Sequence, residues 1–211
     1  MTEIIFNQDD FPHLDKFFRR NLINCLSGFK SLNLVGTIGQ DDRLNLAPFT
    51  QIIHVGASPA LMGMLVRPDS VPRHTLSNIL EREYYTFNHV KETYFKQAHQ
   101  CSARYDISEF EATGIEPYFG DEHPAPYVKE ASLKIGLKLE ERLDLKINGT
   151  IFIIGSVIEI IVPEECLDPD GFIDIEKAGS LTCSGLDAYH ITQRLARLSY
   201  AKPDQELNEL D

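Results

Sequence analysis

The sequence predicts one mainly antiparallel β domain in which a β-meander closes into a barrel and helices lie at its periphery. Two observations carry this prediction. The segment 31–39 alternates apolar and polar residues, and after a turn the segment 44–55 again has strand character. Further along, two long β-branched runs flank the turn signal Asn148-Gly149. A chain of 211 residues also suits a single domain with a sizeable core.

The first third of the chain predicts one helix and three strands. Apolar side chains over 12–25 recur near a period of 3.6 residues, which is typical of an amphipathic helix. Strand patterns follow at 31–39 and 44–55, separated by a turn at Asp41-Asp42. A third apolar run over 59–66 completes an antiparallel meander.

Short helices and a strand are expected in the middle of the chain. Thr75 is a predicted N-cap for a helix of about three turns. Residues 84–90 read as a strand and 92–100 as a helix. Ser108 and Glu111 form the pattern of a capping box, so another short helix should start there.

Two long strands dominate the last third. They are predicted over 131–145 and 149–162, and Asn148-Gly149 supplies the positive φ that a hairpin turn favours. Residues 201–211 are acidic and lack a hydrophobic face, so we expect a frayed tail. The predicted domain therefore spans 1–200.

Composition argues against large anionic partners. The chain has 20 Lys and Arg against 32 Asp and Glu, a net charge of −12 that repels nucleic acids and anionic membranes. No apolar run approaches the ~20 residues of a membrane helix, and no secretory signal is visible. The four cysteines lack a C-x-x-C pair and read as reduced thiols, so we expect a cytoplasmic protein.

Common catalytic and metal-binding motifs are missing from the sequence. It contains no G-x-G-x-x-G, P-loop, G-x-S-x-G or H-E-x-x-H pattern. The seven histidines do not fall at ligand spacing, so no metal site is expected.

One arginine-rich segment is a candidate anion site. Twelve positions of an otherwise acidic chain contain Arg67, Arg73, His74, Thr75 and Asn78. Guanidinium groups match phosphate oxygens, and a hydroxyl and N–H groups at a helix start can complete the cradle. A solvated loop with ordinary helix caps would use the same residues, so spacing alone leaves both interpretations open.

Polar residues also gather on the preceding strand. Asn45, Phe49, Thr50 and Gln51 surround Pro48, which cannot donate to a strand ladder. Polar side chains inside a strand with apolar flanks favour a face that meets a ligand, such as the edge of a heteroaromatic ring. A kinked edge strand would explain them without a ligand.

Taken in order, these motifs resemble the flavin reductase-like, FMN-binding split-barrel family. The resemblance covers about residues 25–190. Its segments are DDRLNLAPFTQ, ASPALMGMLVRP, RHTLSNI, YTFNHV, CSARYDISEFEATGI, the strand start at 125–133, DPDGFID and SGLDAYH.

The resemblance implies an antiparallel, Greek-key-like split β-barrel that forms a homodimer and binds one FMN per subunit, with FAD or riboflavin as alternative flavins. Its flavin ring would lie along Asn45, Phe49, Thr50 and Gln51, with Ser102 and Ala103 against the ring. The phosphate and ribityl chain would be held by Arg67, Arg73, Thr75 and Asn78. His74 stands where the family often has an acidic residue, and an imidazole there favours phosphate binding.

The activity that the resemblance implies is hydride transfer from NADH or NADPH, bound transiently, to the flavin. This transfer needs no side-chain acid, so no catalytic residue is assigned. Tyr189 and His190 are candidates for contacts with the nicotinamide or the flavin face. Two alternatives remain open: an FMN-binding electron relay reduced by a protein partner, and a split barrel that binds another phosphorylated ligand.

Overall fold

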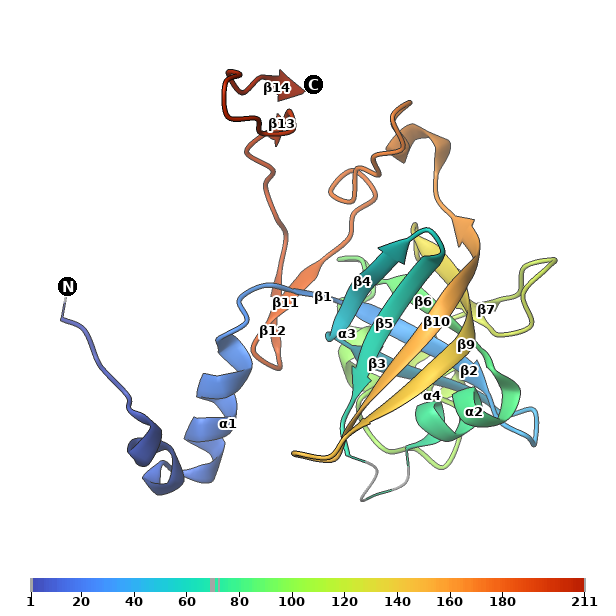
Figure 1. The fold of residues 1–211 in the computed structure, drawn as a ribbon. Helices are drawn as coiled ribbons and strands as arrows, with labels where there is room; N and C mark the ends of the chain where they lie inside the picture. Colours follow the sequence, from blue (N-terminus) through green and yellow to red (C-terminus); the bar gives the residue numbers. More distant parts are fainter. Residues whose placement is uncertain (1, 69–70, 72, 211) are drawn as a thin grey trace.

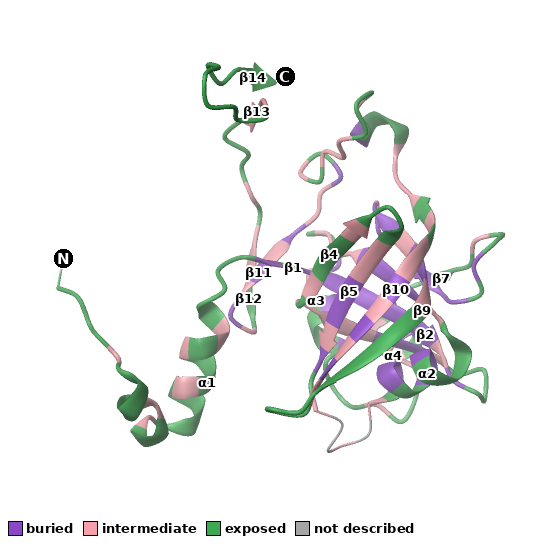
Figure 2. Cartoon of the chain, in the orientation of Figure 1, coloured by how far each residue is buried: buried purple, intermediate pink, exposed green. Residues whose placement is uncertain are grey.

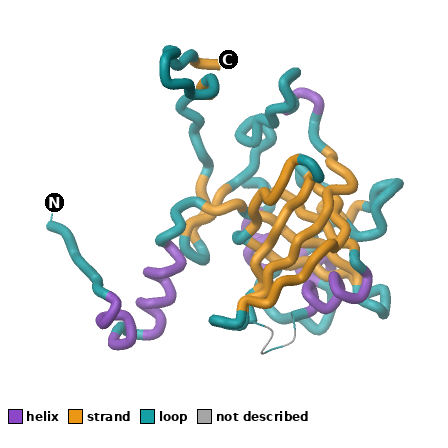
Figure 3. The backbone as a smooth tube through the Cα atoms, in the orientation of Figure 1, coloured by secondary structure: helices purple, strands orange, loops and turns teal. Residues whose placement is uncertain are grey.

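A seven-stranded antiparallel sheet forms the body of the molecule in the computed structural model, which describes residues 2–68, 71 and 73–210. Figure 3 shows these strands gathered on one side, with long irregular segments leading away from them. In sheet order the strands are β3 (Leu44–Phe49), β2 (Asn33–Ile38), β6 (Tyr84–His89), β9 (Lys134–Leu145), β10 (Thr150–Ile161), β5 (Ala60–Val66) and β4 (Ile52–Ala57).

The sheet is closed by the link between its two edge strands. β3 and β4 lie at opposite edges, yet only Thr50 and Gln51 separate them in the chain. Seven strands in a flat sheet would hold these edges about 29 Å apart, whereas such a link spans at most about 11 Å. The sheet must therefore curl into a barrel, which confirms the predicted fold class (Figure 1).

The prediction of a single strand over 44–55 is wrong, because the chain leaves one edge of the sheet and joins the other within this segment. It divides into β3 and β4, and the carbonyl of Gln51 accepts a hydrogen bond from the N–H of Leu65 at 3.0 Å on β5. Residues of strand character lie on both sides of the link, so the prediction joined them into one strand although the polar pair Thr50-Gln51 separates them.

β2 divides the hydrophobic core into two parts, because five of its six residues are buried (Figure 2). Val35 faces the barrel interior, with Phe87, Leu137 and Ile153. Leu34 belongs to the second part, where the sheet packs against α3 (Phe95–Gln100) and α4 (Glu109–Thr113). The second part contains Tyr94, Ala98, Cys101 and Phe110 among others.

The predicted N-terminal helix is present in two pieces. A 3₁₀ helix, η1 (Gln8–His13), precedes α1 (Lys16–Cys25). Asp15 caps α1, since its Oδ1 accepts hydrogen bonds from the N–H groups of Phe17 and Phe18 at 2.9 and 3.0 Å. No residue of α1 is buried, and the helix projects away from the barrel in Figure 1. Its apolar face is exposed.

The helix predicted to start at Thr75 starts earlier. α2 (His74–Arg82) has Arg73 at its N-cap, so Thr75 is the second helical residue and the predicted cap is wrong. At α4, Ser108 stands at the N-cap as predicted, but its buried Oγ has no partner among the described residues.

The hairpin of β9 and β10 confirms the two long strands that were predicted. Gly149 has a φ of +73°, and Oδ1 of Asn148 accepts a hydrogen bond from the Thr150 N–H at 3.0 Å. Between α4 and β9 the chain is proline-rich, a composition that favours an extended surface loop, but this segment is only partly exposed. It contains the pair β7 (Pro117–Tyr118) and β8 (Tyr127–Val128), and His123, Ala125 and β8 are buried.

A small second sheet and a pair of short strands complete the chain. β1 (Lys30–Ser31), β11 (Thr182–Ser184) and β12 (Ala188–His190) form a three-stranded sheet, and the 3₁₀ helix η2 (Glu164–Cys166) follows β10. Near the C-terminus, β13 (Arg197–Leu198) pairs with β14 (Glu209–Leu210). The last strand thus lies within the acidic segment 201–211.

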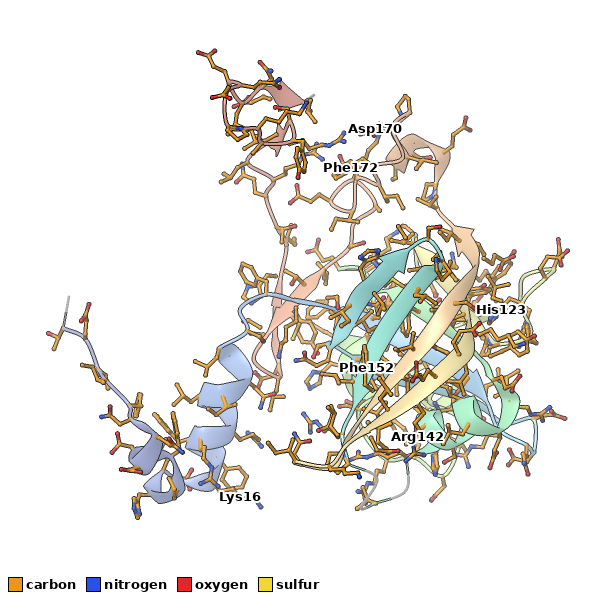
Figure 4. All side chains as sticks on the ribbon, in the orientation of Figure 1. Lys16, His123, Arg142, Phe152, Asp170 and Phe172 are labelled. Atoms are coloured by element: carbon orange, nitrogen blue, oxygen red, sulfur yellow. The ribbon has the colours of Figure 1, made fainter. Side chains whose placement is uncertain are left out.

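Ionic and aromatic contacts hold the C-terminal segment to the loop after η2. The Arg197 guanidinium lies 3.9 Å from the centroid of the Phe172 ring and bonds Asp168 and Asp170 at 3.0 and 2.5 Å. Figure 4 shows Phe172 and Asp170 at this junction. No helix in the described part of the chain is long and apolar enough to cross a membrane.

We predict that Gly36→Ala lowers the free energy of unfolding by about 3 kcal/mol. A Cβ at Gly36 would lie 2.1 Å from the carbonyl oxygen of Pro126 and 2.7 Å from Oγ1 of Thr86, so the backbone itself would have to move. Denaturant unfolding measures the change. Gly56→Ala, whose nearest contact would be 3.2 Å, is the control and should cost less. Equal effects would contradict the close approach at Gly36.

Candidate functional site

One cavity of about 680 Å³ opens where the β3 edge, the start of α2, the link between α3 and α4 and the β11–β12 hairpin meet. This volume is within the range of small-molecule sites. Of the eleven flavin-binding residues that the sequence resemblance implies, only Asn78 is absent from its wall. The others that line it are Asn45, Phe49, Thr50, Gln51, Arg67, Arg73, His74, Thr75, Ser102 and Ala103.

The free edge of β3 forms one wall. On its other side β3 pairs with β2, so the outward N–H and C=O groups of β3 are not used by the sheet. The N–H of Leu46 is held by Glu109, whose Oε2 accepts it at 3.1 Å. Pro48 lies two residues further along the same side, where it removes the next N–H donor. The remaining backbone groups are available to a ligand.

Positive groups form a second wall at the start of α2. Arg73 donates from Nε to the carbonyl of Pro68 at 3.3 Å, and within the described ranges no carboxylate forms an ion pair with Arg67, Arg73 or His74. The N-terminal end of α2 adds free N–H groups and the positive end of the helix dipole. These groups could hold an anion locally, although the chain has a net charge of −12.

Buried hydrogen bonds connect these two walls. Nδ2 of Asn45 donates to Oγ1 of Thr75 at 3.0 Å and to Oγ1 of Thr37 at 3.1 Å. Asn78 lies behind them, and its Nδ2 donates to the same Thr37 oxygen at 3.0 Å. Asn78 is therefore placed behind the cavity wall rather than on it.

Tyr189 and His99 form an aromatic pair on a third part of the cavity wall. The Tyr189 hydroxyl and Nδ1 of His99 lie 2.5 Å apart, and the Phe95 ring is 5.4 Å from that of Tyr189. Burial raises the pKa of Tyr189 to about 12, so its phenol stays protonated at neutral pH. His190 is not on the wall; its Nε2 lies 2.8 Å from Oγ of Ser184.

Several lining residues were not selected from the sequence. They come from β3, β5 and α2, and also from the end of α1, the segment before β2, the α3–α4 region and the β11–β12 hairpin, which meet only in the folded chain. Glu109 could have been found through its place in the capping-box segment. The residues missed are Asn24, Leu32, Ala47, Leu65, Val66, Leu76, His99, Cys101, Arg104, Tyr105, Glu109, Cys183 and Leu186.

The arrangement is suited to binding rather than to side-chain chemistry. An elongated ligand could place an anionic group at α2 and a flat ring along β3, with Tyr189 and His99 also facing the cavity. Among the described residues no cluster of His, Cys, Asp or Glu could hold a metal ion. The fold is that of a split-barrel protein, and the cavity has the size and lining of a small-molecule site.

Comparison with known proteins identifies the family. The model of the flavin reductase like domain matches residues 29–177, so the chain belongs to this family. The fold resembles the crystal structure of a candidate flavin reductase with a split barrel domain from Shewanella frigidimarina NCIMB 400. That structure has 45% identity, a TM-score of 0.91 and coverage of 94% of this chain and 100% of that chain.

Two more distant structures share the fold. Nitrilotriacetate monooxygenase component B from Bacillus cereus is 20% identical, with a TM-score of 0.81 and coverage of 94% of this chain and 100% of that chain. The 2-nitrobenzoate 2-nitroreductase of Pseudomonas fluorescens is 23% identical, with a TM-score of 0.79 and coverage of 97% and 99%. At these identities the likeness concerns the fold alone.

Proposed function

We propose that the cavity binds FMN and that the protein is an NAD(P)H-dependent flavin oxidoreductase. The observation that carries the proposal is the union, in one cavity, of an anion site at α2 with the free edge of β3. Membership of the flavin reductase like family supports it. So does the name of the relative from Shewanella frigidimarina, which is 45% identical.

The anion site favours FMN over the alternative flavins. Riboflavin has no phosphate to occupy it, and FAD would have to extend a second nucleotide beyond it. Arg67 and Arg73 would bind the phosphate oxygens, with Thr75 and the N–H groups of α2 completing the cradle. His74 contributes an imidazole that carries positive charge when protonated.

The opposite wall fits a flat heteroaromatic ring. Backbone groups of β3 beside Pro48 can meet the polar edge of the ring, while Phe49, Thr50 and Gln51 lie where the chain crosses to β4. Ser102 and Ala103 are small and let a ring approach closely. Asn45 supplies a fixed side-chain amide at this wall.

A bound flavin would supply the hydride-accepting chemistry itself. The residues of this chain bind and orient it: the arginines fix one end, and the β3 edge fixes the plane of the ring. Tyr189 keeps a protonated hydroxyl at the cavity wall, where this hydroxyl and His99 can form hydrogen bonds with a nicotinamide or an electron acceptor. NADH or NADPH would enter and leave as a transient donor.

We expect the purified protein to bind FMN and the bound flavin to lose its visible absorbance on anaerobic mixing with NADH or NADPH. Stopped-flow absorbance measures the rate with each donor. Binding without bleaching would reject the reductase and favour an electron relay reduced by a protein partner. Failure to bind any flavin would reject the proposal and favour another phosphorylated ligand.

Replacing Arg67 or Arg73 with Ala should weaken FMN binding at least tenfold and riboflavin binding much less. The reason is that a charge-assisted hydrogen bond to phosphate contributes about 1.5–3 kcal/mol. Quenching of flavin fluorescence measures both affinities. Arg82→Ala is the matched control, because Arg82 lies on α2 but bonds Asp42 at 2.8 Å, away from the cavity wall. Equal losses for FMN and riboflavin would contradict the phosphate assignment.

We also propose that the chain forms a homodimer. Apolar residues of the N-terminal segment are exposed, including Ile4, Phe17, Phe18 and Leu26, and α1 stands away from the barrel (Figure 2). Exposed apolar surface of this kind is typical of an interaction site. A second copy of the chain would cover it.

Light scattering should therefore give a mass of twice 23.9 kDa. Substitution of Phe18 by Asp should shift the equilibrium toward the monomer, because a charge would have to be buried in the interface. Glu3→Lys, an exposed change in the same segment, is the control. A monomer of the unaltered chain at micromolar concentration would contradict the proposal.

We place the protein in the cytoplasm. All four cysteines are free thiols, as expected for a reducing compartment.

A further inference from the structure

Four strands of the barrel share an outer side that is apolar and uncovered. On β10, Ile151 and Ile153 fill the barrel interior, so Phe152 and Ile154, which alternate with them, point outward. The Phe152 ring lies across β5, because a Cβ added at Gly63 would be 2.4 Å from it. A sheet side that faces water normally carries polar side chains, so the apolar ones here indicate a surface that another element covers.

The neighbouring strands extend this surface. Leu65 on β5 and Leu143 on β9 lie opposite Phe152, and Ile53 and Val55 on β4 are 51% and 39% exposed. Figure 1 shows β4, β5, β10 and β9 side by side with no helix of the described chain in front of them, and Figure 4 shows Phe152 there. We call this surface the open sheet face; its residues are Ile53, Val55, Leu65, Leu143, Phe152 and Ile154.

α1 carries an apolar stripe that is also largely uncovered. Phe18, Leu22 and Leu26 recur at intervals of four residues, so they lie along one side of the helix. Phe18 is 50% exposed and Leu26 is 69% exposed, and no residue of α1 is buried. An amphipathic helix and the apolar side of a sheet are the two halves of a helix-on-sheet contact. One chain therefore contains both halves without joining them.

The charges of the two surfaces are opposite. α1 contains Lys16, Arg19 and Arg20 and no acidic residue, and within the described ranges none of the three cations forms an ion pair. Glu140 and Glu141 are exposed on β9, at the margin of the open sheet face. Opposite charges around an apolar contact favour the correct pairing of two surfaces. The basic helix thus fits the acidic margin as well as the apolar centre.

We propose that α1 of one chain packs on the open sheet face of a second copy, which returns its own α1 to the first chain. α1 stands away from its own barrel in Figure 1, so the helix of a second copy is the occupant that this chain itself supplies. An exchange in both directions is self-complementary, as a two-fold dimer requires. This inference rests on the proposed homodimer and names the surface that would cover the N-terminal segment.

Charge reversal followed by mixing tests the exchange. One variant combines Lys16→Glu with Arg20→Glu, and the other combines Glu140→Lys with Glu141→Lys. Each variant alone should dimerise roughly tenfold more weakly than the unaltered chain, because like charges would then face each other. An equimolar mixture should regain the affinity of the unaltered chain, because the helix of each variant meets the sheet face of the other. Analytical ultracentrifugation measures all three.

The outcomes separate this proposal from the homodimer itself. Dimers of unchanged affinity in both variants would overturn the exchange but leave the homodimer standing. Weakened variants that mixing does not restore would overturn it too, because they would indicate that α1 packs on its own barrel. A monomeric unaltered chain would reject the homodimer and the exchange together. None of these measurements needs a ligand, so they are independent of flavin binding.

A second pair of variants tests the apolar centre of the contact. Ile53→Asp places a carboxylate on the open sheet face and should weaken the dimer roughly tenfold, because the charge would have to be buried. Ile107→Asp is the matched control, since Ile107 is 46% exposed in the link between α3 and α4, outside the open sheet face. Both positions are exposed, so both variants should fold. Equal dimer affinities of the two variants would overturn the proposal.

Discussion

The two-residue link between β3 and β4 is the constraint on which the rest of the molecule depends. Because Thr50 and Gln51 join the opposite edges of the sheet, the sheet has to close, and the two edge strands meet without pairing along their length. Closure creates the barrel interior around Val35 and Phe87. It also leaves the outer edge of β3 free beside α2, and this free edge is a wall of the cavity.

The acidic composition of the chain argues against large anionic partners but not against a small anion in this cavity. A net charge of −12 disfavours a large polyanion that would lie across the surface. It has less effect on a small anion, because the field of Arg67 and Arg73 acts at short range and salt screens the distant carboxylates. The local charge at the start of α2 therefore suits the proposed phosphorylated ligand, whereas the bulk charge alone points away from one.

Local signals explain why much of the fold and about half of the candidate site could be predicted. The β9–β10 hairpin follows from β-branched runs around Asn148-Gly149, and the cavity residues on β3 and α2 lie in short motifs. What could not be predicted depends on long-range contacts. The positions of Tyr189 and Asn78 follow from partners that are 90 and 41 residues away, His99 and Thr37. The residue pattern along the sequence does not indicate which distant residues form such pairs.

The cavity also depends on parts of the chain that do not belong to the barrel. Tyr189 and Cys183 reach it from the small sheet of β1, β11 and β12, and Asn24 reaches it from the end of α1. β12 leads into the segment that Arg197 fixes to Phe172 and Asp168. The barrel alone therefore supplies the anion site and the β3 edge, while docking of the terminal segments completes the remaining wall. Ligand binding and the order of these segments must consequently be coupled, because a ligand that touches both walls stabilises the docked state.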